Sequence, residues 1–257
     1  MYSILEHYLS TNHILMIGMI VTFILTFFLL EHPFSFLPSD QGRAFAVNGS
    51  LSKGKLRGVG FIFVLCFLIS SVLFLPIDVE YVIYAILLFA MMISGYLDDA
   101  SKTPWNEYKK GLIDLVISVV AVLTYMNFNS TTICFGADEI VIPKALFLIL
   151  GVILIWVSVN VTNCTDGVDG LCASLCSVTL LAFGVLFAPI LQKYAMANFL
   201  FLSVLFAYLY FNSSPSSMLM GDAGSRALGF YIAVIALKST HPFIYILLAA
   251  VMIVDGG

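Results

Sequence analysis

Charged residues are scarce in this chain, and their scarcity excludes a soluble globular protein. Only 10% of the 257 residues are Asp, Glu, Lys or Arg, whereas 61% are hydrophobic, and uncharged apolar runs recur along the whole sequence. Runs of about 18 or more apolar residues are typical of helices that cross a lipid bilayer. The composition therefore predicts an integral membrane protein without a soluble module.

Cysteine is also too scattered to indicate a zinc centre or a redox pair. The five cysteines, Cys66, Cys134, Cys164, Cys172 and Cys176, form neither a zinc-binding spacing nor a CxxC motif. Cys172 and Cys176 lie one helical turn apart, where small polarizable side chains pack well between membrane helices. We therefore expect the cysteines to serve packing and assign them no function.

Hydropathy predicts an all-α polytopic bundle, formed by residues 1–257 as a single transmembrane domain. The expected spans lie near residues 13–31, 58–77, 81–97, 111–128, 143–162, 171–188, 196–211 and 223–238, and a ninth starts at Phe243. The first span lacks a basic flank and a cleavage pattern, so we expect a retained helix and not a signal peptide. The ninth run stops at Asp255-Gly256-Gly257, so we expect the natural carboxyl end to be missing. Asp255 lies beside two glycines and predicts a break in this last helix.

Lysine and arginine positions predict the orientation, because cytoplasmic loops carry the excess of these residues. An amino terminus outside the cell places these basic residues on the cytoplasmic side: Arg43, Lys53, Lys55, Arg57, Lys102, Lys109, Lys110 and Arg226. Only Lys144, Lys193 and Lys238 fall on the other side. Five acids that played no part in this assignment also fall on the cytoplasmic side: Asp98, Asp99, Asp166, Asp169 and Asp222. Such clustering is expected of a protein that binds a substrate at one membrane face.

The stretch from Asn160 to Leu171 concentrates amides, carboxylates and glycines at the end of a long apolar run. Asn160 and Asn163 share a face if the helix continues this far, and Asp166 and Asp169 repeat the three-residue spacing. The glycine after each acid allows close approach of a ligand. The stretch suits a metal–phosphate or nucleotide substrate, although Asn, Asp and Gly are also the commonest residues of simple turns.

Two further motifs place acids at helix ends. Asp98 and Asp99 adjoin at the end of an expected helix, where the helix dipole does not stabilise negative charge. A divalent cation or a lysine of the following loop is therefore expected beside them. Asp222, in Met220-Gly-Asp222-Ala-Gly-Ser225, precedes the next helix as either its N-cap or a ligand of Mg²⁺, which prefers oxygen donors and substrate phosphates.

A basic stretch with glycines, Lys53-Gly-Lys55-Leu-Arg57-Gly-Val-Gly60, starts the second span. It is either a positive flank of a membrane helix or a set of cations that stabilises charge on a diphosphate. A catalytic interpretation requires Asp98, Asp166 and Asp222 to lie close together, in a cytosol-facing cleft that opens laterally to lipid.

In chain order, three motifs resemble the polyprenyl-phosphate N-acetylhexosamine-1-phosphate transferases: Asp98-Asp99, Asn160-x-x-Asn163-x-Thr165-Asp166-Gly-x-Asp169-Gly-Leu171 and Met220-Gly-Asp222-x-Gly-Ser225. Thr165 before Asp166, and Lys102 after the Asp pair, resemble the branch with a MurNAc-pentapeptide donor. The resemblance implies a bacterial plasma-membrane enzyme with ten helices, forming a homodimer without a nucleic-acid partner. It would use Mg²⁺ to transfer phospho-MurNAc-pentapeptide from UDP-MurNAc-pentapeptide to undecaprenyl phosphate, giving lipid I and UMP for peptidoglycan synthesis.

The resemblance also implies residue roles. Asp98 would be the base on the lipid phosphate, Asp99 its neighbour in the site, and Asp222 the metal ligand. The residues implied to line the substrate sites are Lys109, one of Lys53 and Lys55, Asn160, Asn163, Asp166, Gly167, Asp169 and Leu219, which stands where relatives often have an aromatic residue. Direct attack by the lipid phosphate and a covalent phospho-enzyme are both compatible with these roles.

Other functions remain open at the level of sequence. A transferase that uses UDP-GlcNAc would have the same fold and metal chemistry. An ion or proton transporter would hold its acids near the bilayer midplane, whereas these acids gather at one face. A lipid-binding structural subunit would have no use for adjacent carboxylates.

Overall fold

The computed structural model describes residues 1–257 except 33–34, 41–52, 102, 104, 137 and 257. Arg43 and Lys102 lie outside the described residues. The elements are α1 (Tyr2–Leu5), α2 (Thr11–Glu31), α3 (Gly60–Phe74), α4 (Val79–Asp99), α5 (Glu107–Phe128), β1 (Thr132–Phe135), β2 (Asp138–Val141), α6 (Lys144–Thr165), α7 (Leu171–Leu186), α8 (Ala188–Leu191), α9 (Lys193–Asn212), α10 (Gly221–Lys238), α11 (Pro242–Leu248) and α12 (Ala250–Gly256).

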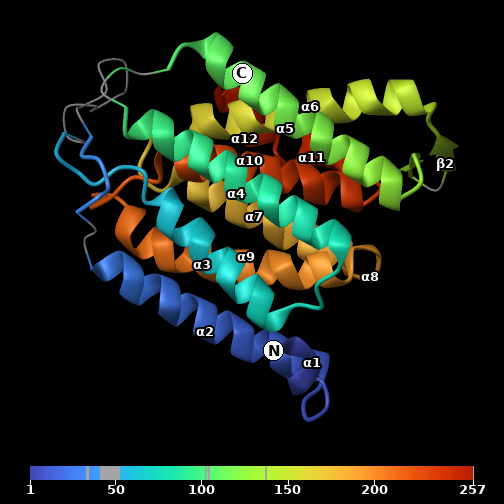
Figure 1. Ribbon diagram of the computed structural model, residues 1–257, viewed down its shortest axis with the longest axis horizontal. Helices are drawn as coiled ribbons and strands as arrows, with labels where there is room; N and C mark the ends of the chain where they lie inside the picture. Colours follow the sequence, from blue (N-terminus) through green and yellow to red (C-terminus); the bar gives the residue numbers. More distant parts are fainter. Residues whose placement is uncertain (33–34, 41–52, 102, 104, 137, 257) are drawn as a thin grey trace.

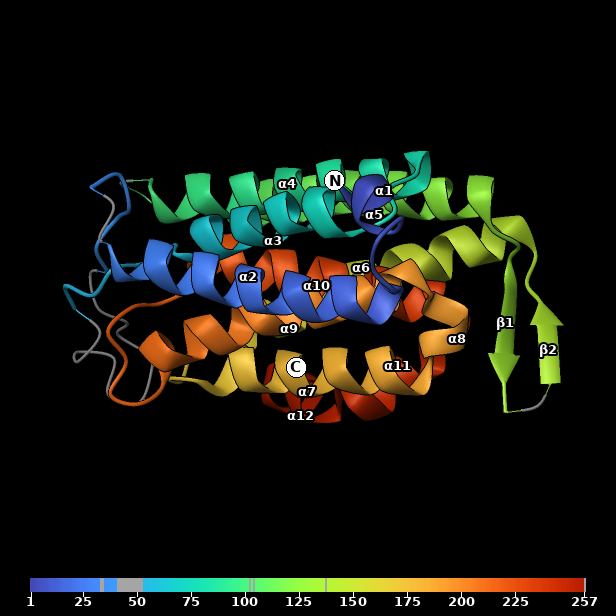
Figure 2. The same ribbon diagram turned by 90° about the horizontal axis from the view of Figure 1, so that it is seen from below.

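The long helices lie side by side along the longest axis of the molecule (Figures 1 and 2). The connections between α2 and α3, α4 and α5, α6 and α7, and α9 and α10 are gathered at one end of the bundle (Figure 2). The β1–β2 hairpin and α8 lie at the opposite end. The five acids that the sequence places on one face therefore share one end of the bundle.

A helical segment is present at each of the nine expected spans, with ends shifted by a few residues. Five described helices, α2, α4, α5, α6 and α9, are long and apolar enough to cross a bilayer, and α3 and α7 are apolar but shorter. The chain is thus a mainly helical, multi-pass membrane protein.

Two details of the expected fold are corrected. The chain is not purely helical, because β1 and β2 pair as an antiparallel hairpin with Ile133 opposite Ile140; β-branched residues favour strands in this segment. The break in the last helical segment lies at Ala249, between α11 and α12, and not beside Asp255. Asp255 instead stays within α12 with an exposed side chain.

Helix α10 forms the centre of the bundle. Every residue from Gly221 to Leu237 is buried, and the helix packs most extensively against α4 and α6. Glycines make this packing close. A Cβ added to Gly95 of α4 would lie 2.3 Å from the carbonyl oxygen of Asp222, and one added to Gly60 of α3 would lie 2.1 Å from the amide nitrogen of Gly224. Small residues of this kind let helix backbones approach each other in membrane proteins.

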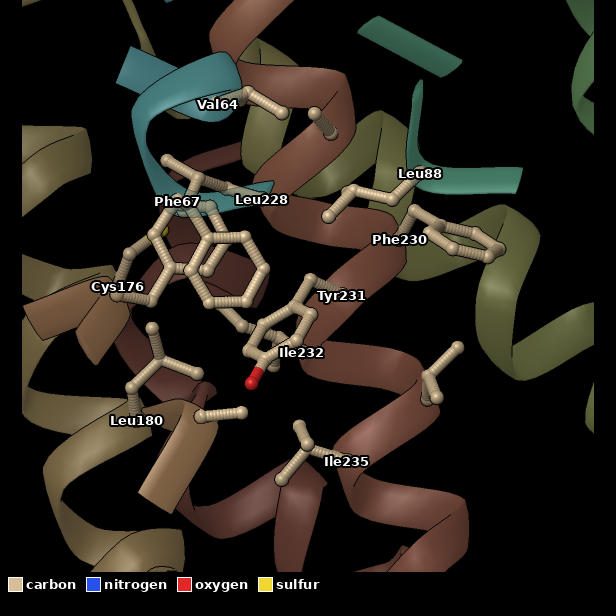
Figure 3. Close-up of a cluster of buried hydrophobic side chains, with 14 of the residues drawn as sticks. Val64, Phe67, Leu88, Cys176, Leu180, Leu228, Phe230, Tyr231, Ile232 and Ile235 are labelled. Carbon is tan, nitrogen blue, oxygen red and sulfur yellow. The ribbon is translucent and has the colours of Figure 1, made fainter. Parts of the chain in front are cut away.

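Aromatic side chains fill the interior beside α10 (Figure 3). Phe67 of α3 stacks on Phe201 of α9 with ring centroids 4.1 Å apart, and Tyr231 of α10 meets both rings edge-on. The Tyr231 hydroxyl donates a hydrogen bond of 3.0 Å to Oδ1 of Asn198, so this buried polar atom is satisfied within an apolar region. The rigid interior fixes the position at which α10 begins.

Substitution of Gly95 by alanine tests the close contact between α4 and α10. The added methyl group overlaps the carbonyl of Asp222, so we expect Gly95→Ala to lower the free energy of unfolding by about 1–3 kcal/mol, measured by thermal unfolding in detergent. Gly111→Ala is the matched control, because a Cβ at this helical glycine meets nothing within 4 Å; it should leave stability unchanged or raise it by up to about 1 kcal/mol. Equal melting temperatures for the two variants would contradict the proposed packing.

Candidate active site

Asp98 lies at the carboxyl end of α4 with both carboxylate oxygens engaged. Oδ1 accepts a hydrogen bond of 2.7 Å from the backbone N–H of Trp105, and Oδ2 lies 2.6 Å from Nζ of Lys110. The residue is 7% exposed. A lysine thus compensates the acid at the end of α4, as the sequence predicts, and it is Lys110 of α5 that does so.

Asp99, the next residue, turns toward the start of α10. Its Oδ2 accepts a hydrogen bond of 3.2 Å from the backbone N–H of Ala223, and its Oδ1 forms an ion pair of 2.8 Å with Nε of Arg57. Gly221 makes this approach possible, because a Cβ there would lie 2.3 Å from Oδ2 of Asp99 and the backbone has a φ of +66°. A side chain at position 221 would therefore both strain the backbone and displace the acid.

Asp222 lies in the first turn of α10 and completes the cluster. Its Oδ1 is 3.3 Å from Nη2 of Arg57, and its Oδ2 is 3.2 Å from Nζ of Lys110. The N-cap residue of α10 is Met220, without a side-chain capping bond, so Asp222 is not the N-cap. Asp98, Asp99 and Asp222 are therefore linked through two shared cations.

Arg57 reaches the acids because the segment before α3 pairs with the segment before α10. The N–H of Leu219 donates to the carbonyl of Leu56 at 2.8 Å, and the N–H of Gly60 donates to the carbonyl of Met220 at 3.0 Å. Arg57 also contacts a third acid, Asp40, at 3.4 Å. Burial by itself lowers the pKa of the Arg57 guanidinium, but Asp99, Asp222 and Asp40 outweigh this effect and raise the pKa above its usual value.

A second polar group joins the loop after α6 to the segment before α10. Asp169 accepts hydrogen bonds from the N–H and the hydroxyl of Ser216, at 2.9 and 2.7 Å. Lys55 donates to the Ser216 hydroxyl at 2.8 Å and lies 3.6 Å from Asp169. Partial burial opposes ionisation of Asp169, but the bonds from Ser216 and Lys55 prevail and lower the pKa of its carboxyl group.

The central stretch contributes further residues to this end of the bundle. Helix α6 continues through Thr165, and Oδ1 of Asn163 accepts a hydrogen bond of 2.8 Å from the hydroxyl of Ser225 on α10. Asp166 is 8% exposed and lies within electrostatic range of Arg57. Asp222 therefore shares Lys110 with Asp98 and shares the electrostatic influence of Arg57 with Asp166, so the three acids lie at one site.

The remaining expected residues differ in their contacts and in their exposure. The amide nitrogen of Asn160 donates to the carbonyl of Trp156 in its own helix, and Gly167 is exposed. The amine of Lys109 lies 3.2 Å from the centroid of the Trp105 ring. Lys53 is exposed, whereas Leu219 is buried.

Sequence reasoning gave Arg57 only as one of three cations that could face a diphosphate, missed Asp40, and favoured Lys109 over Lys110. A weak signal was available for the lysine. Asn106 is the N-cap of α5 and accepts a hydrogen bond from the N–H of Lys109, so it marks where the helix begins. Successive helical residues point about 100° apart, so Lys109 and Lys110 face different sides of α5. For Arg57, alternation in an extended segment puts residues 55 and 57 on one side, but no local pattern predicts which acids they meet.

The donor chemistry of the cluster fits a hard divalent cation. Asp98 and Asp222 both contact the Lys110 amine, so their carboxylates lie close enough to share one cation. No group of three or more acidic, histidine or cysteine side chains forms a ready-made metal site within the residues that the structure describes. Mg²⁺ typically uses only one or two carboxylates and completes its coordination with substrate phosphates and water. Two carboxylates of this cluster therefore suffice.

Comparison with known proteins identifies the family. The family model described as glycosyl transferase family 4 matches residues 81–240. A phospho-N-acetylmuramoyl-pentapeptide-transferase of Treponema pallidum is 35% identical over 263 residues, covering 94% of this chain and 72% of that protein. Proteins of the same name from Halalkalibacterium halodurans and Dictyoglomus turgidum are 28% and 25% identical, and the alignments cover 95% of this chain and 81% and 80% of those proteins. The chain belongs to glycosyl transferase family 4 and, within it, to the phospho-N-acetylmuramoyl-pentapeptide-transferases.

Proposed function

We propose that this protein transfers phospho-MurNAc-pentapeptide from UDP-MurNAc-pentapeptide to undecaprenyl phosphate, forming lipid I and UMP in peptidoglycan synthesis. The observation that carries the proposal is the cluster of Asp98, Asp99 and Asp222 around Lys110 and Arg57. Transfer between two phosphates develops negative charge, and cations and a metal ion positioned for that charge are the main source of catalysis in such reactions. The family membership supports the same activity.

The proposed residue roles follow from the position of each group. Asp98 accepts the proton of the lipid phosphate, since its carboxylate faces the Lys110 amine that would hold the same phosphate. Asp222, with Asp98 beside it, would hold Mg²⁺, which when bound supplies positive charge to the diphosphate of the donor. Asp99 fixes Arg57 against the start of α10.

Binding of the nucleotide sugar is proposed for the neighbouring loops. Asn163, Asp166 and Asp169 come from the end of α6 and the loop after it, and Ser216 and Lys55 hold Asp169 in place. We also propose substrate contacts for Asn160, Gly167, Lys53, Lys109 and Leu219.

The lipid substrate needs an apolar surface that begins beside the acids. A groove of about 560 Å³ lies between α5 and α6 and is lined by Tyr108, Leu112, Leu115, Ile153 and Trp156 among others. The lining also includes Glu107, three residues before Lys110 on α5, so the groove reaches the helical turn that carries the proposed phosphate contact. We infer that the first isoprenoid units of the lipid carrier occupy this groove, and we propose that the groove is the lateral opening toward lipid.

We further propose nine membrane crossings with the amino terminus outside and the active site facing the cytoplasm. The excess of Lys and Arg at the end that holds the acids supports this orientation. UDP-linked precursors are soluble, so a site on that side meets its donor directly. A homodimer is proposed on the family resemblance alone.

Release of UMP tests the proposed activity. Purified protein is incubated with undecaprenyl phosphate and Mg²⁺, and UDP-MurNAc-pentapeptide and UDP-GlcNAc are offered separately. We expect UMP from the pentapeptide donor alone. UMP from UDP-GlcNAc alone would move the protein to the other branch of the superfamily, and no UMP from either donor would refute a transferase.

Neutral replacements of the two central acids test the residue roles. Asp98→Asn and Asp222→Asn keep the size of each side chain but remove its charge, so kcat should fall by about 10²–10⁴-fold while the protein stays folded. Steady-state UMP release and thermal unfolding provide the two measurements. Asp138→Asn in β2, which is exposed at the opposite end, is the matched control and should keep wild-type turnover. Wild-type kcat in either active-site variant would remove that acid from the mechanism.

A further inference from the structure

We propose that Asp114 and Arg226 are positioning residues that hold Lys110 and Asp222 in register across the candidate active site. The pair is buried one helical turn deeper than the site and has no part in the roles assigned above. Nη2 of Arg226 lies 2.5 Å from Oδ1 of Asp114, and the two residues are 1% and 2% exposed. Only the kinetic test of this inference rests on the proposed function.

The four residues form two rungs of a ladder between α5 and α10. Lys110 and Asp114 are four residues apart on α5, and Asp222 and Arg226 are four residues apart on α10, so each pair shares a helix face. Lys110 contacts Asp222 at 3.2 Å in the outer rung, and Asp114 contacts Arg226 in the inner rung. Because the spacing is four residues on both helices, the inner ion pair keeps Lys110 and Asp222 of the outer rung opposite each other.

The packing of the helices supports this dependence. Helix α10 packs extensively on α4 and α6, whereas few residues of α5 come close to it. The long side chains of Lys110 and Arg226 therefore carry most of the connection between α5 and α10 at this end. Otherwise α5 is positioned relative to α10 only indirectly, through α4 and α6, on which both helices pack. The two rungs are therefore the direct side-chain link that aligns Lys110 with Asp222.

The signs of the four charges add a second reason. Charge alternates along each helix, so Lys110 attracts Asp114 and Asp222 attracts Arg226 within the same helix, in addition to the pairs across the gap. A buried charged side chain without an ion-pair partner is costly, so its pairing with another charged group nearby becomes favourable. If Asp114 is neutralised, the nearest acid on the same helix face as Arg226 is Asp222. Arg226 then competes with Lys110 for Asp222 and disturbs the site.

A double apolar variant separates positioning from stability. Replacing both partners of a buried ion pair by apolar residues is often neutral for stability, so Asp114→Leu/Arg226→Met should melt near the wild-type temperature. Displacement of a catalytic group by about 1 Å can cost 10²-fold in rate, so we expect kcat for UMP release to fall about 10- to 100-fold. KM for UDP-MurNAc-pentapeptide should change by less than about threefold, because the nucleotide-binding loops are untouched. The single variant Arg226→Lys keeps the positive charge beside Asp114 and should retain most of the wild-type kcat.

The reactivity of Lys110 provides a readout that does not depend on activity. The Lys110 amine lies between the carboxylates of Asp98 and Asp222, and its side chain is 18% exposed. If the inner rung holds the amine there, its loss frees the amine for reagents, so we expect acylation of Lys110, mapped by mass spectrometry, to become about threefold faster or more in the double variant. Lys144, exposed at the start of α6, serves as the internal reference and should react equally in both proteins.

Each outcome decides the proposal. A folded double variant with wild-type kcat and wild-type Lys110 acylation would overturn the positioning role. If the double variant does not fold, the same two measurements on Asp114→Asn, which keeps the side-chain shape, decide in its place. If the wild type releases no UMP, the proposed function fails, and Lys110 acylation alone still tests the ladder.

Discussion

Several carboxylates buried together in a membrane protein require cations beside them, and the active-site end of this bundle is built around that requirement. An uncompensated buried charge costs several kcal/mol, and Asp98, Asp99 and Asp222 are each less than a tenth exposed on their side chains. Lys110 and Arg57 offset the cost, and each bridges acids from more than one element. The arrangement pairs each acid with a cation of the protein and still presents charge of both signs to a substrate.

The fold provides this arrangement through close backbone packing. Gly95 and Gly60 let α4 and α3 approach the start of α10, so the acids at the end of α4 reach the amide groups and the acid of its first turn. The segment that carries Arg57 then pairs by backbone hydrogen bonds with the segment before α10. Close backbone packing and backbone hydrogen bonds thus bring together charged residues that are far apart in the sequence.

Much of the helical architecture could be predicted from the sequence, because hydropathy depends on composition within each segment. The clustering of Asp98, Asp166 and Asp222 could be predicted as well, since helices of similar length that alternate in direction bring every second loop to the same end. The motif that spans Asp166 and Asp169 predicts a functional loop, because turn residues alone do not require two acids.

Other features depend on long-range contacts and could not be predicted. Arg57 looked like one cation of a positive flank, and its role depends on pairing with a segment about 160 residues away. The choice between Lys109 and Lys110 depends on the phase of α5, which its N-cap sets. The charges of Asp114 and Arg226 appeared unrelated in sequence, and the ion pair between them exists only because α5 and α10 share a register. The β1–β2 hairpin is too short for a clear alternation of polar and apolar residues.

The location of a bound divalent cation would show whether Asp98 and Asp222 share a cation. Mn²⁺ can replace Mg²⁺ in crystals of the protein with UDP, and its anomalous scattering locates it independently of the protein atoms. We expect one Mn²⁺ peak about 2 Å from an oxygen of Asp222 and from an oxygen of Asp98, with the Lys110 amine displaced from its present position. A peak coordinated only by Asp166 and Asp169, with Lys110 still between Asp98 and Asp222, would contradict this expectation.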